Sequence, residues 1–321
     1  MVIFMNHKIP IVVIAGATAV GKSEVAFELA KRIDGEIISG DSMQVYKGMD
    51  IGTAKPSKAE QTGVKHHLID SLDINEPFSV RQFTELAKKA AEDIVSREKI
   101  PILAGGTGLY IEMLLNATLL PETESTASLR EVYMTLAQTL GNNKLHEILR
   151  SVDEASAEKL HPNNVKRVVR ALEVYHTTGK TIGEWNEQSH IIPSDFRPFM
   201  VYIKGSREWL YNRINLRVDK FIEQGLVDEV KALYDIGLED TITASQSIGY
   251  KEFFPYFEGL CSLEEVFDQI KKATRNFAKR QETYFNRMKF DIELDGEEKR
   301  YEVKVNNVEK LLKTEGFCDI I

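Results

Sequence analysis

The sequence predicts an α/β fold, in which a parallel sheet flanked by helices is interrupted by an all-helical insertion. Short apolar, β-branched runs alternate with helical patterns early in the chain, which is typical of parallel strands with helices on both faces. Between about residues 121 and 194 no segment has the character of a buried strand, and that character returns at 199–205. We therefore expect a core formed by residues 1–120 and 195–321, with residues 121–194 inserted as a helical domain.

Three apolar runs in the first part of the chain are expected to be buried strands, each followed by a helix. The helix over 79–97 has the clearest signal, because Ser79 and Gln82 have the spacing of a capping box and apolar side chains then form one stripe. The strands are expected at 9–15, 36–39 and 101–106, and the helices at 22–33, at 79–97 and from about 109.

The rest of the chain is expected to be mainly helical. In the insertion, the third helix would begin with a capping box formed by Ser151 and Glu154. A long helix would begin at Ser262, where Glu265 completes a similar box, and end near Arg287. The insertion helices are expected at 128–140, at 143–150, from 151 and at 164–176; in the core we expect helices within 206–236, and a short strand and a terminal helix within 291–321.

The composition is that of a soluble globular protein. The chain has 321 residues, of which 43% are apolar and 28% are charged, and no window approaches the roughly 18 to 20 apolar residues of a membrane span. The first ten residues are too short for a secretory signal. Cys261 and Cys318 form neither a disulfide framework nor a zinc pattern. We expect a cytoplasmic protein in which His66 and His67 lie in a loop and bind no metal.

The net charge of −8 argues against nucleic-acid binding, but the charge is unevenly distributed. Residues 271–289 contain seven Lys or Arg side chains and one acid. Residues 163–170 contain three Lys or Arg side chains and no acid. Such local stretches allow an acidic protein to hold a phosphate backbone. Solvated helix faces are the alternative interpretation.

Residues Gly16 to Ser23 match the phosphate-loop pattern G-x-x-x-x-G-K-[ST], with an apolar strand before and a helix after it. The glycines allow backbone amides to turn around an anion, and the helix N-terminus adds positive potential. Lys22 supplies a charge, and the hydroxyl of Ser23 is suited to Mg²⁺. The loop indicates a di- or triphosphate ligand without fixing the reaction. The strand at 101–106 lacks the terminal Asp that often holds Mg²⁺ in ATP-using enzymes.

Asp41 and Thr107 each follow a predicted strand, and the carboxyl ends of parallel strands line the ligand crevice. Asp41 is suited to bind Mg²⁺, to bind a hydroxyl group or to act as a general base, and the cap of a turn is its alternative role. Thr107 is equally suited to cap a helix. Arg213 and Arg217 share one helix face. They would neutralise a diphosphate if that face meets the crevice, and would otherwise be solvated.

The block DSMQVYKGMDIGTAKP at residues 41–56 closely resembles the signature of the tRNA dimethylallyltransferases, also called tRNA isopentenyltransferases. Gly40 is a departure, because the resemblance leads us to expect a larger aliphatic residue there. The other landmarks occur in the family's order over nearly the whole chain: GATAVGKS (16–23), AGGTGLY (104–110), HPNNVKRVVRALEVY (161–175), the Arg213/Arg217 pair, QSIGYKE (246–252) and ATRNFAKRQETYF (273–285).

The resemblance implies a phosphate-loop, kinase-like core whose loop holds dimethylallyl diphosphate instead of a nucleotide, together with Mg²⁺. It also implies that the insertion domain binds the anticodon stem of tRNA. The acceptor would be N6 of adenosine 37, next to the anticodon, in tRNAs that read codons beginning with U. We expect the enzyme to act as a monomer.

The resemblance and the chemistry of transfer together suggest roles for individual residues. Asp41 would accept the N6 proton, and Gln44 would read the flipped adenine through its carboxamide. The expected catalytic residues are Asp41, Thr107 and Arg217. The expected diphosphate ligands are Gly16, Thr18, Ala19, Gly21, Lys22, Ser23 and Arg213, with Ser23 also binding Mg²⁺. The expected tRNA contacts are Asp41, Ser42, Met43, Gln44, Thr107, Arg130, Lys166, Arg167, Arg170, Gln246, Lys251, Lys272, Arg275, Lys279 and Arg280.

Three other functions remain open at the level of sequence. The phosphate loop alone favours an ATP-dependent kinase of a small metabolite, and a non-catalytic RNA-binding ATPase would use the same loop. Prenylation of free AMP or ADP would use the same chemistry. The helical insertion argues against this last function, since a free nucleotide needs no clamp for an RNA stem.

Overall fold

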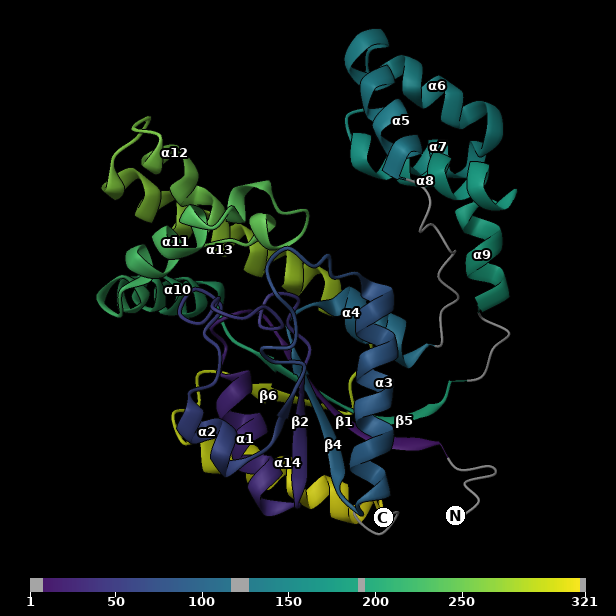
Figure 1. The fold of residues 1–321 in the computed structure, drawn as a ribbon. Helices are drawn as coiled ribbons and strands as arrows, with labels where there is room; N and C mark the ends of the chain where they lie inside the picture. Colours follow the sequence, from purple (N-terminus) through teal and green to yellow (C-terminus); the bar gives the residue numbers. More distant parts are fainter. Residues whose placement is uncertain (1–7, 117–126, 190–193, 318–321) are drawn as a thin grey trace. The chain divides into compact units, whose positions relative to one another are not determined.

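A computed structural model describes residues 8–116, 127–189 and 194–317, and the chain divides into two compact units (Figure 1). The larger unit consists of Met1–Leu114 and Asp195–Ile321, and the smaller unit of Leu115–Ser194. Among the described residues, no helix has both the length and the apolar character that a membrane span requires.

A six-stranded, all-parallel sheet forms the centre of the larger unit and confirms the predicted α/β class. The strand order is β3-β2-β4-β1-β5-β6. Strand β5, which follows the smaller unit in sequence, pairs with β1 from Ile9 opposite Phe196 to Gly16 opposite Ile203. The two parts of the core thus share one sheet. The strands are β1 (Ile9–Gly16), β2 (Gly35–Ser39), β3 (His66–His67), β4 (Ile100–Gly105), β5 (Phe196–Lys204) and β6 (Ile292–Asp295).

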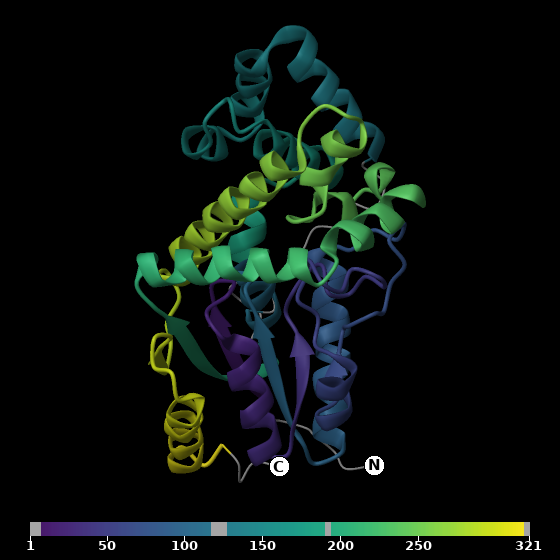
Figure 2. The same ribbon diagram turned by 90° about the vertical axis from the view of Figure 1, so that its left-hand side faces the viewer.

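Helices cover both faces of this sheet, with α1 and α14 on one face and α3 on the other (Figure 1). Figure 2 shows α10 and α13 lying across the carboxyl ends of the strands. The predicted capping boxes of α3 and α13 are both formed. The helices of this unit are α1 (Lys22–Arg32), α2 (Lys58–Gly63), α3 (Val80–Ser96), α4 (Gly108–Leu115), α10 (Arg207–Glu223), α11 (Leu226–Asp235), α12 (Phe254–Phe257), α13 (Leu263–Phe285) and α14 (Tyr301–Thr314).

Helices are the only regular elements among the described residues of the smaller unit, which has an apolar core of its own. The predicted capping box of Ser151 and Glu154 is wrong. Ser151 lies inside α6 and donates its hydroxyl to the carbonyl of Ile148 at 2.7 Å. Asp153 caps the next helix instead and accepts the Ser156 amide at 2.9 Å, because the apolar stripe of α6 continues to Val152. The helices are α5 (Ala127–Leu140), α6 (Asn142–Val152), α7 (Glu154–Lys159), α8 (Val165–Thr178) and α9 (Ile182–Ser189).

His66 and His67 form the edge strand β3, so their placement in a loop is also wrong. A nitrogen of the His67 ring lies 2.8 Å from the carboxylate of Glu36, which Arg97 also contacts with two nitrogens. Hydrogen bonding from Arg97, aided by His67, lowers the pKa of the buried Glu36 to about 2. A strand of two residues carries no apolar run, and pairing with β2 is what makes it extended.

Candidate active site

The phosphate loop joins β1 to α1 and has the geometry of an anion site. Gly21 has a φ of 99°, which favours glycine, and it precedes α1 without any side-chain cap on the first amides. A Cβ atom on Gly16 would lie 2.6 Å from the carbonyl oxygen of Ile203 on the neighbouring strand. Both glycines are therefore required for this turn, and the uncapped amides of α1 are free to bind a phosphate group.

Lys22 supplies a cation to this loop. Its ammonium donates to the carbonyl of Ala17 at 2.7 Å. The pKa of Lys22 is lowered to about 7, chiefly by burial and secondly by the charge of Arg217, while the charge of Asp41 opposes the shift. A bound diphosphate would restore the charged form, since a neighbouring anion stabilises an ammonium ion.

A cleft of about 800 Å³ opens beside Lys22, between the phosphate loop, residues 50–61 and α10. Arg213 and Arg217 both line this cleft, so their shared face is not simply solvated surface. Arg213 donates to the carbonyl of Ala19 at 2.8 Å and lies over the ring of Trp209. Burial lowers the pKa of Arg217, and the charges of Asp41 and Glu24 oppose this shift. Three cations thus converge on one end of the cleft.

Asp41 is partly buried just after β2, close enough to act electrostatically on Lys22 and Arg217. Its Oδ1 accepts the amide of Met43 at 2.8 Å. The role as a turn cap therefore occupies one carboxylate oxygen. Within the described residues, no hydrogen bond reaches the second oxygen. The proposed role of Asp41 as a base is compatible with this geometry and stays a prediction.

Thr107 begins the turn into α4 through its carbonyl, which accepts the amide of Tyr110 at 2.9 Å. Its hydroxyl makes no hydrogen bond with another described residue, so the side chain does not cap α4. Tyr110 stacks on Phe83 and is largely buried. Burial, with smaller contributions from the charges of Tyr46 and Asp41, raises the pKa of Tyr110. The Thr107 hydroxyl is thus available to a ligand.

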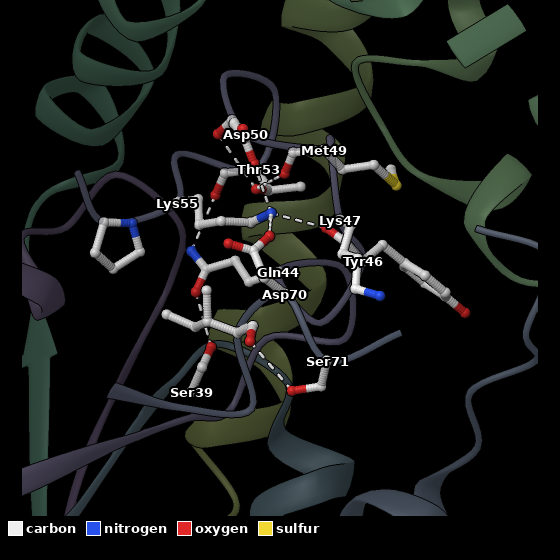
Figure 3. Close-up of polar contacts among 12 residues, drawn as sticks. Ser39, Gln44, Tyr46, Lys47, Met49, Asp50, Thr53, Lys55, Asp70 and Ser71 are labelled. Atoms are coloured by element: carbon white, nitrogen blue, oxygen red, sulfur yellow. Dashed lines mark hydrogen bonds and ion pairs between the residues drawn. The ribbon is translucent and has the colours of Figure 1, made fainter. Parts of the chain in front are cut away.

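The segment that contains the family signature is folded upon itself (Figure 3). The Gln44 carboxamide accepts from the Ser39 hydroxyl at 2.8 Å and donates to the carbonyls of Thr53 and Ala54 at 3.1 and 3.2 Å. To read an adenine, Gln44 would have to exchange these bonds, so this role stays a prediction. Ser42 and Met43 lie partly buried between Asp41 and Gln44.

Lys55 stabilises the same segment from within. Its side chain is only 3% exposed. The ammonium donates to the carbonyl of Tyr46 at 2.7 Å and pairs with Asp50 and Asp70 at 2.6 and 2.5 Å. A buried ammonium with three oxygen partners fixes the end of the loop that faces the cleft.

Glu229 and Tyr250 hold the loop from outside, and neither is among the site residues predicted from the sequence. Glu229 of α11 accepts the amides of three consecutive residues, at 3.1 Å for Asp50, 2.8 Å for Ile51 and 3.2 Å for Gly52. It also accepts the hydroxyl of Tyr250 at 2.6 Å. Tyr250 lies in the QSIGYKE landmark. The predicted tRNA contacts from this landmark, Gln246 and Lys251, are both exposed, and their contact with tRNA stays a prediction.

The predicted tRNA contacts on α13 divide into two groups. Lys272, Lys279 and Arg280 are exposed, whereas Arg275 donates to the side chain of Asn215 on α10 at 2.6 Å. The exposed group is available to a phosphate backbone. Arg275 contributes to packing between α10 and α13.

The smaller unit shows a similar division. Lys166 and Arg167 are exposed in the first turn of α8. Arg130 pairs with Glu173, with its Nε 2.7 Å from the carboxylate, and Arg170 lies 3.7 Å from the same group. Glu173 is fully buried. Arg130 and Arg170 therefore neutralise a buried acid, and their RNA contacts stay a prediction.

The ends of β2 and β4 approach each other so closely that Gly105 is expected to tolerate no side chain. A Cβ on Gly105 would lie 2.6 Å from the Gly40 carbonyl oxygen. A Cβ on Gly40 would in turn lie 3.2 Å from the Gly105 Cα, so there is little room here for the larger aliphatic residue that the resemblance suggests. Gly105→Ala should lower the free energy of unfolding by about 1–3 kcal/mol. Denaturant titration measures this loss.

The matched control for Gly105 is Gly183→Ala, where the nearest atom to the new Cβ would be the Thr181 hydroxyl at 3.7 Å. Alanine is the better helix former at this position in α9, so stability should be unchanged or slightly higher. Equal losses in both variants would contradict the close-approach explanation.

Donor binding is expected to weaken as the pH rises above about 7. Lys22 has a pKa of about 7 in this structure, and pairing with a diphosphate raises it. Binding above that pH takes up a proton, so the affinity should fall by up to about tenfold per pH unit. The phosphate ionises at about pH 6 and cannot cause this fall. Titration calorimetry against pH measures it.

The control for this pH effect is Lys22→Arg, whose guanidinium stays charged across the same range. Its donor affinity should be nearly independent of pH. A wild-type affinity that is flat from about pH 6 to about pH 9 would be inconsistent with a role for the Lys22 charge in donor binding.

Comparison with known proteins shows the family to which this chain is similar. A family model described as IPP transferase matches residues 44–288. The tRNA dimethylallyltransferase of Geobacillus thermodenitrificans is 46% identical over 301 residues, covering 93% of this chain and 94% of that protein. The enzyme of the same name from Anoxybacillus flavithermus is 47% identical over 276 residues, covering 86% of each.

Two solved structures show the likeness in three dimensions. A tRNA isopentenylpyrophosphate transferase from Staphylococcus epidermidis has a TM-score of 0.71 at 41% identity, covering 96% of this chain and all of that chain. A eukaryotic dimethylallyltransferase, described as acting on tRNA, has a TM-score of 0.81 at 31% identity, covering 97% of this chain and 79% of the other.

Proposed function

The chain belongs to the IPP transferase family, and from this membership we propose that it transfers a dimethylallyl group from dimethylallyl diphosphate to tRNA. The acceptor in this proposal is N6 of adenosine 37, in tRNAs that read codons beginning with U. The observation that supports the donor most directly is the convergence of Lys22, Arg213 and Arg217 beside the uncapped amides of α1.

The phosphate loop is proposed to hold the diphosphate of the donor. During transfer the bond between the allylic carbon and oxygen breaks, and the diphosphate leaves with its bonding electrons. Fixed cations and amides aimed at the departing oxygens stabilise this charge without reorganisation. Lys22 and Arg217 supply the cations, and Gly21 to Ser23 supply the amides.

Mg²⁺ is proposed to bind at this site, with the diphosphate among its ligands. Ser23 is exposed in the first turn of α1 and lines the cleft. Across the described parts of the chain, no cluster of three His, Cys, Asp or Glu side chains is suited to hold a metal. The Ser23 hydroxyl would therefore be one ligand of the ion, and phosphate oxygens and water would be the others. Such mixed coordination is common for Mg²⁺. When bound, the ion neutralises charge on the leaving group.

Asp41 is proposed to accept the proton of the adenine amine. The lone pair of N6 is delocalised into the ring, so nucleophilic attack needs removal of a proton as the N–C bond forms. The second carboxylate oxygen of Asp41 receives no bond from the described residues, and this oxygen would take the proton. The free hydroxyl of Thr107 is proposed to orient the reacting groups.

The exposed basic side chains are proposed to hold the RNA backbone. Lys279 and Arg280 on α13 would contact the anticodon loop, and Lys166 and Arg167 on the helical unit would contact the stem. Phosphate contacts of this kind position the RNA, while base contacts select it. The adenosine must leave its stack to react.

All proposed ligands come from one chain, so we propose that the enzyme acts as a monomer. We also propose that it acts where tRNA resides, in the cytoplasm.

Incubation of the protein with a tRNA transcript and labelled donor tests this function. Label from dimethylallyl diphosphate should appear in the RNA, at adenosine 37, and Lys22→Ala should abolish the transfer. Label in AMP but not in tRNA would favour the free-nucleotide acceptor. ATP consumption with a metabolite, or ATP hydrolysis stimulated by RNA, would instead support the kinase or the ATPase.

A further inference from the structure

The buried side chain of Gln281 joins two loops of the active site. Gln281 lies on α13 and is 6% exposed. Its Oε1 accepts the backbone amide of Thr18 in the phosphate loop at 2.8 Å. Its Nε2 donates to the carbonyl of Gly106, the residue before Thr107, at 2.9 Å. One side chain therefore bridges the donor loop and the turn after β4.

The chemistry of the two partners fixes the orientation of this carboxamide. A backbone amide only donates and a carbonyl only accepts, so one orientation satisfies both bonds and the flipped orientation satisfies neither. The carboxamide packs tightly against Gly106, because a Cβ on Gly106 would lie 2.3 Å from the Gln281 Nε2. The bridge also occupies the Thr18 amide, which is therefore not a phosphate ligand while the bridge is intact.

We propose that Gln281 is a positioning residue, which sets the distance between the diphosphate loop and the turn that carries Thr107. This inference rests on the function proposed above. The loop that contains Thr18 is proposed to bind the donor, and Thr107, in the turn after Gly106, is proposed to orient the reacting groups. A displacement of about 1 Å between reacting groups can slow a reaction about 10²-fold.

Gln281 lies on the helix that also carries predicted RNA contacts, so its positioning role involves the RNA as well as the donor. Lys279 and Arg280 immediately precede Gln281 and are exposed on the same helix. A rigid helix that holds RNA phosphates on one face and both catalytic loops on another fixes donor and acceptor in one frame. Gln281 connects α13 to the donor loop through its bond with the Thr18 amide.

Two variants separate the parts of the bridge. Gln281→Met has a similar length and no polar atoms, so it removes both bonds. Gln281→Glu keeps an acceptor for the Thr18 amide and, in its ionised form, loses the donor to Gly106. The matched control is Thr283→Ala on the same helix, where the hydroxyl only bonds the Lys279 carbonyl at 2.8 Å on the exposed side.

The measurements are the single-turnover rate with saturating substrates, the dissociation constants for donor analogue and tRNA, and hydrogen exchange at the Thr18 amide. Both Gln281 variants should slow transfer by about 10- to 100-fold, while tRNA affinity changes by less than about threefold. The Thr18 amide should exchange faster in Gln281→Met, and should remain protected in Gln281→Glu. Thr283→Ala should match the wild type in each measurement.

Transfer rates within about twofold of wild type in a folded Gln281→Glu protein would overturn the proposal, and so would unchanged Thr18 exchange in Gln281→Met. A purely structural role would lower tRNA affinity and the unfolding midpoint together with the rate. If Gln281→Met does not fold, the Gln281→Glu rate decides. If the wild type transfers no label to tRNA, the proposed function fails, while Thr18 exchange still decides whether the bridge exists in solution.

Discussion

Asp41→Asn is expected to slow transfer to tRNA by about 10²- to 10⁴-fold, the usual contribution of a general base. Asparagine keeps an oxygen that can accept the Met43 amide, the bond that Asp41 Oδ1 makes at 2.8 Å. The turn should therefore persist, and only the base and its charge are lost. The rate is measured in a single turnover with saturating donor, because the Asp41 charge also raises the pKa of Lys22.

Asp50→Asn is the matched control for Asp41. It removes a carboxylate of the same segment whose partner, Lys55, keeps Asp70 as a second partner. The Asp50 side chain is 59% exposed, and without it the buried Lys55 ammonium still bonds the Tyr46 carbonyl and pairs with Asp70. We expect a change of less than about threefold in rate. An Asp41→Asn protein that binds tRNA and transfers at nearly the wild-type rate would exclude Asp41 as the base.

Arg217→Gln is expected to slow the chemical step by about 10²- to 10³-fold, the effect of removing one preorganised donor from a developing anion. Arg217 lines the cleft next to Lys22, and it is the second cause of the low pKa of Lys22. Its loss should therefore also raise that pKa. The donor affinity of the variant would then begin to fall at a higher pH than in the wild type.

Lys220→Gln tests whether this effect belongs to Arg217 or to the positive charge of α10 in general. Lys220 lines the same cleft but is exposed. Its removal should alter the single-turnover rate by less than about threefold and leave the pH profile in place. Equal losses in the Arg217 and Lys220 variants would mean that the cleft acts only through its overall field.

The sequence was sufficient to predict the phosphate loop because every requirement of that turn is local. An apolar strand, two glycines and a following helix are all visible within residues 9–33. The spacing of Arg213 and Arg217 likewise placed them on one helix face. Which way this face points depends on how α10 crosses the strand ends, and only the fold shows that it lines the cleft.

The residues that sequence reasoning missed act through contacts between distant segments. Glu229 binds amides of residues 50–52, and Gln281 binds Thr18 and Gly106. Their partners are backbone groups, which leave no residue type in the sequence to match. For Tyr250 a signal exists in its landmark motif, although the charged and amide side chains beside it are the residue types that predict RNA contacts. Long-range hydrogen bonds of this kind can be identified only once the fold is known.

The distance between the Asp41 carboxylate and N6 of the acceptor adenine is the most direct test of the proposed chemistry. It is measurable in a crystal structure with a non-reactive donor analogue and an anticodon stem-loop. We expect the diphosphate on the amides of residues 21–23 and the extruded N6 about 2.6–3.2 Å from Asp41. A nucleoside triphosphate bound productively in the loop, or an Asp41 carboxylate remote from any extruded base, would contradict this mechanism.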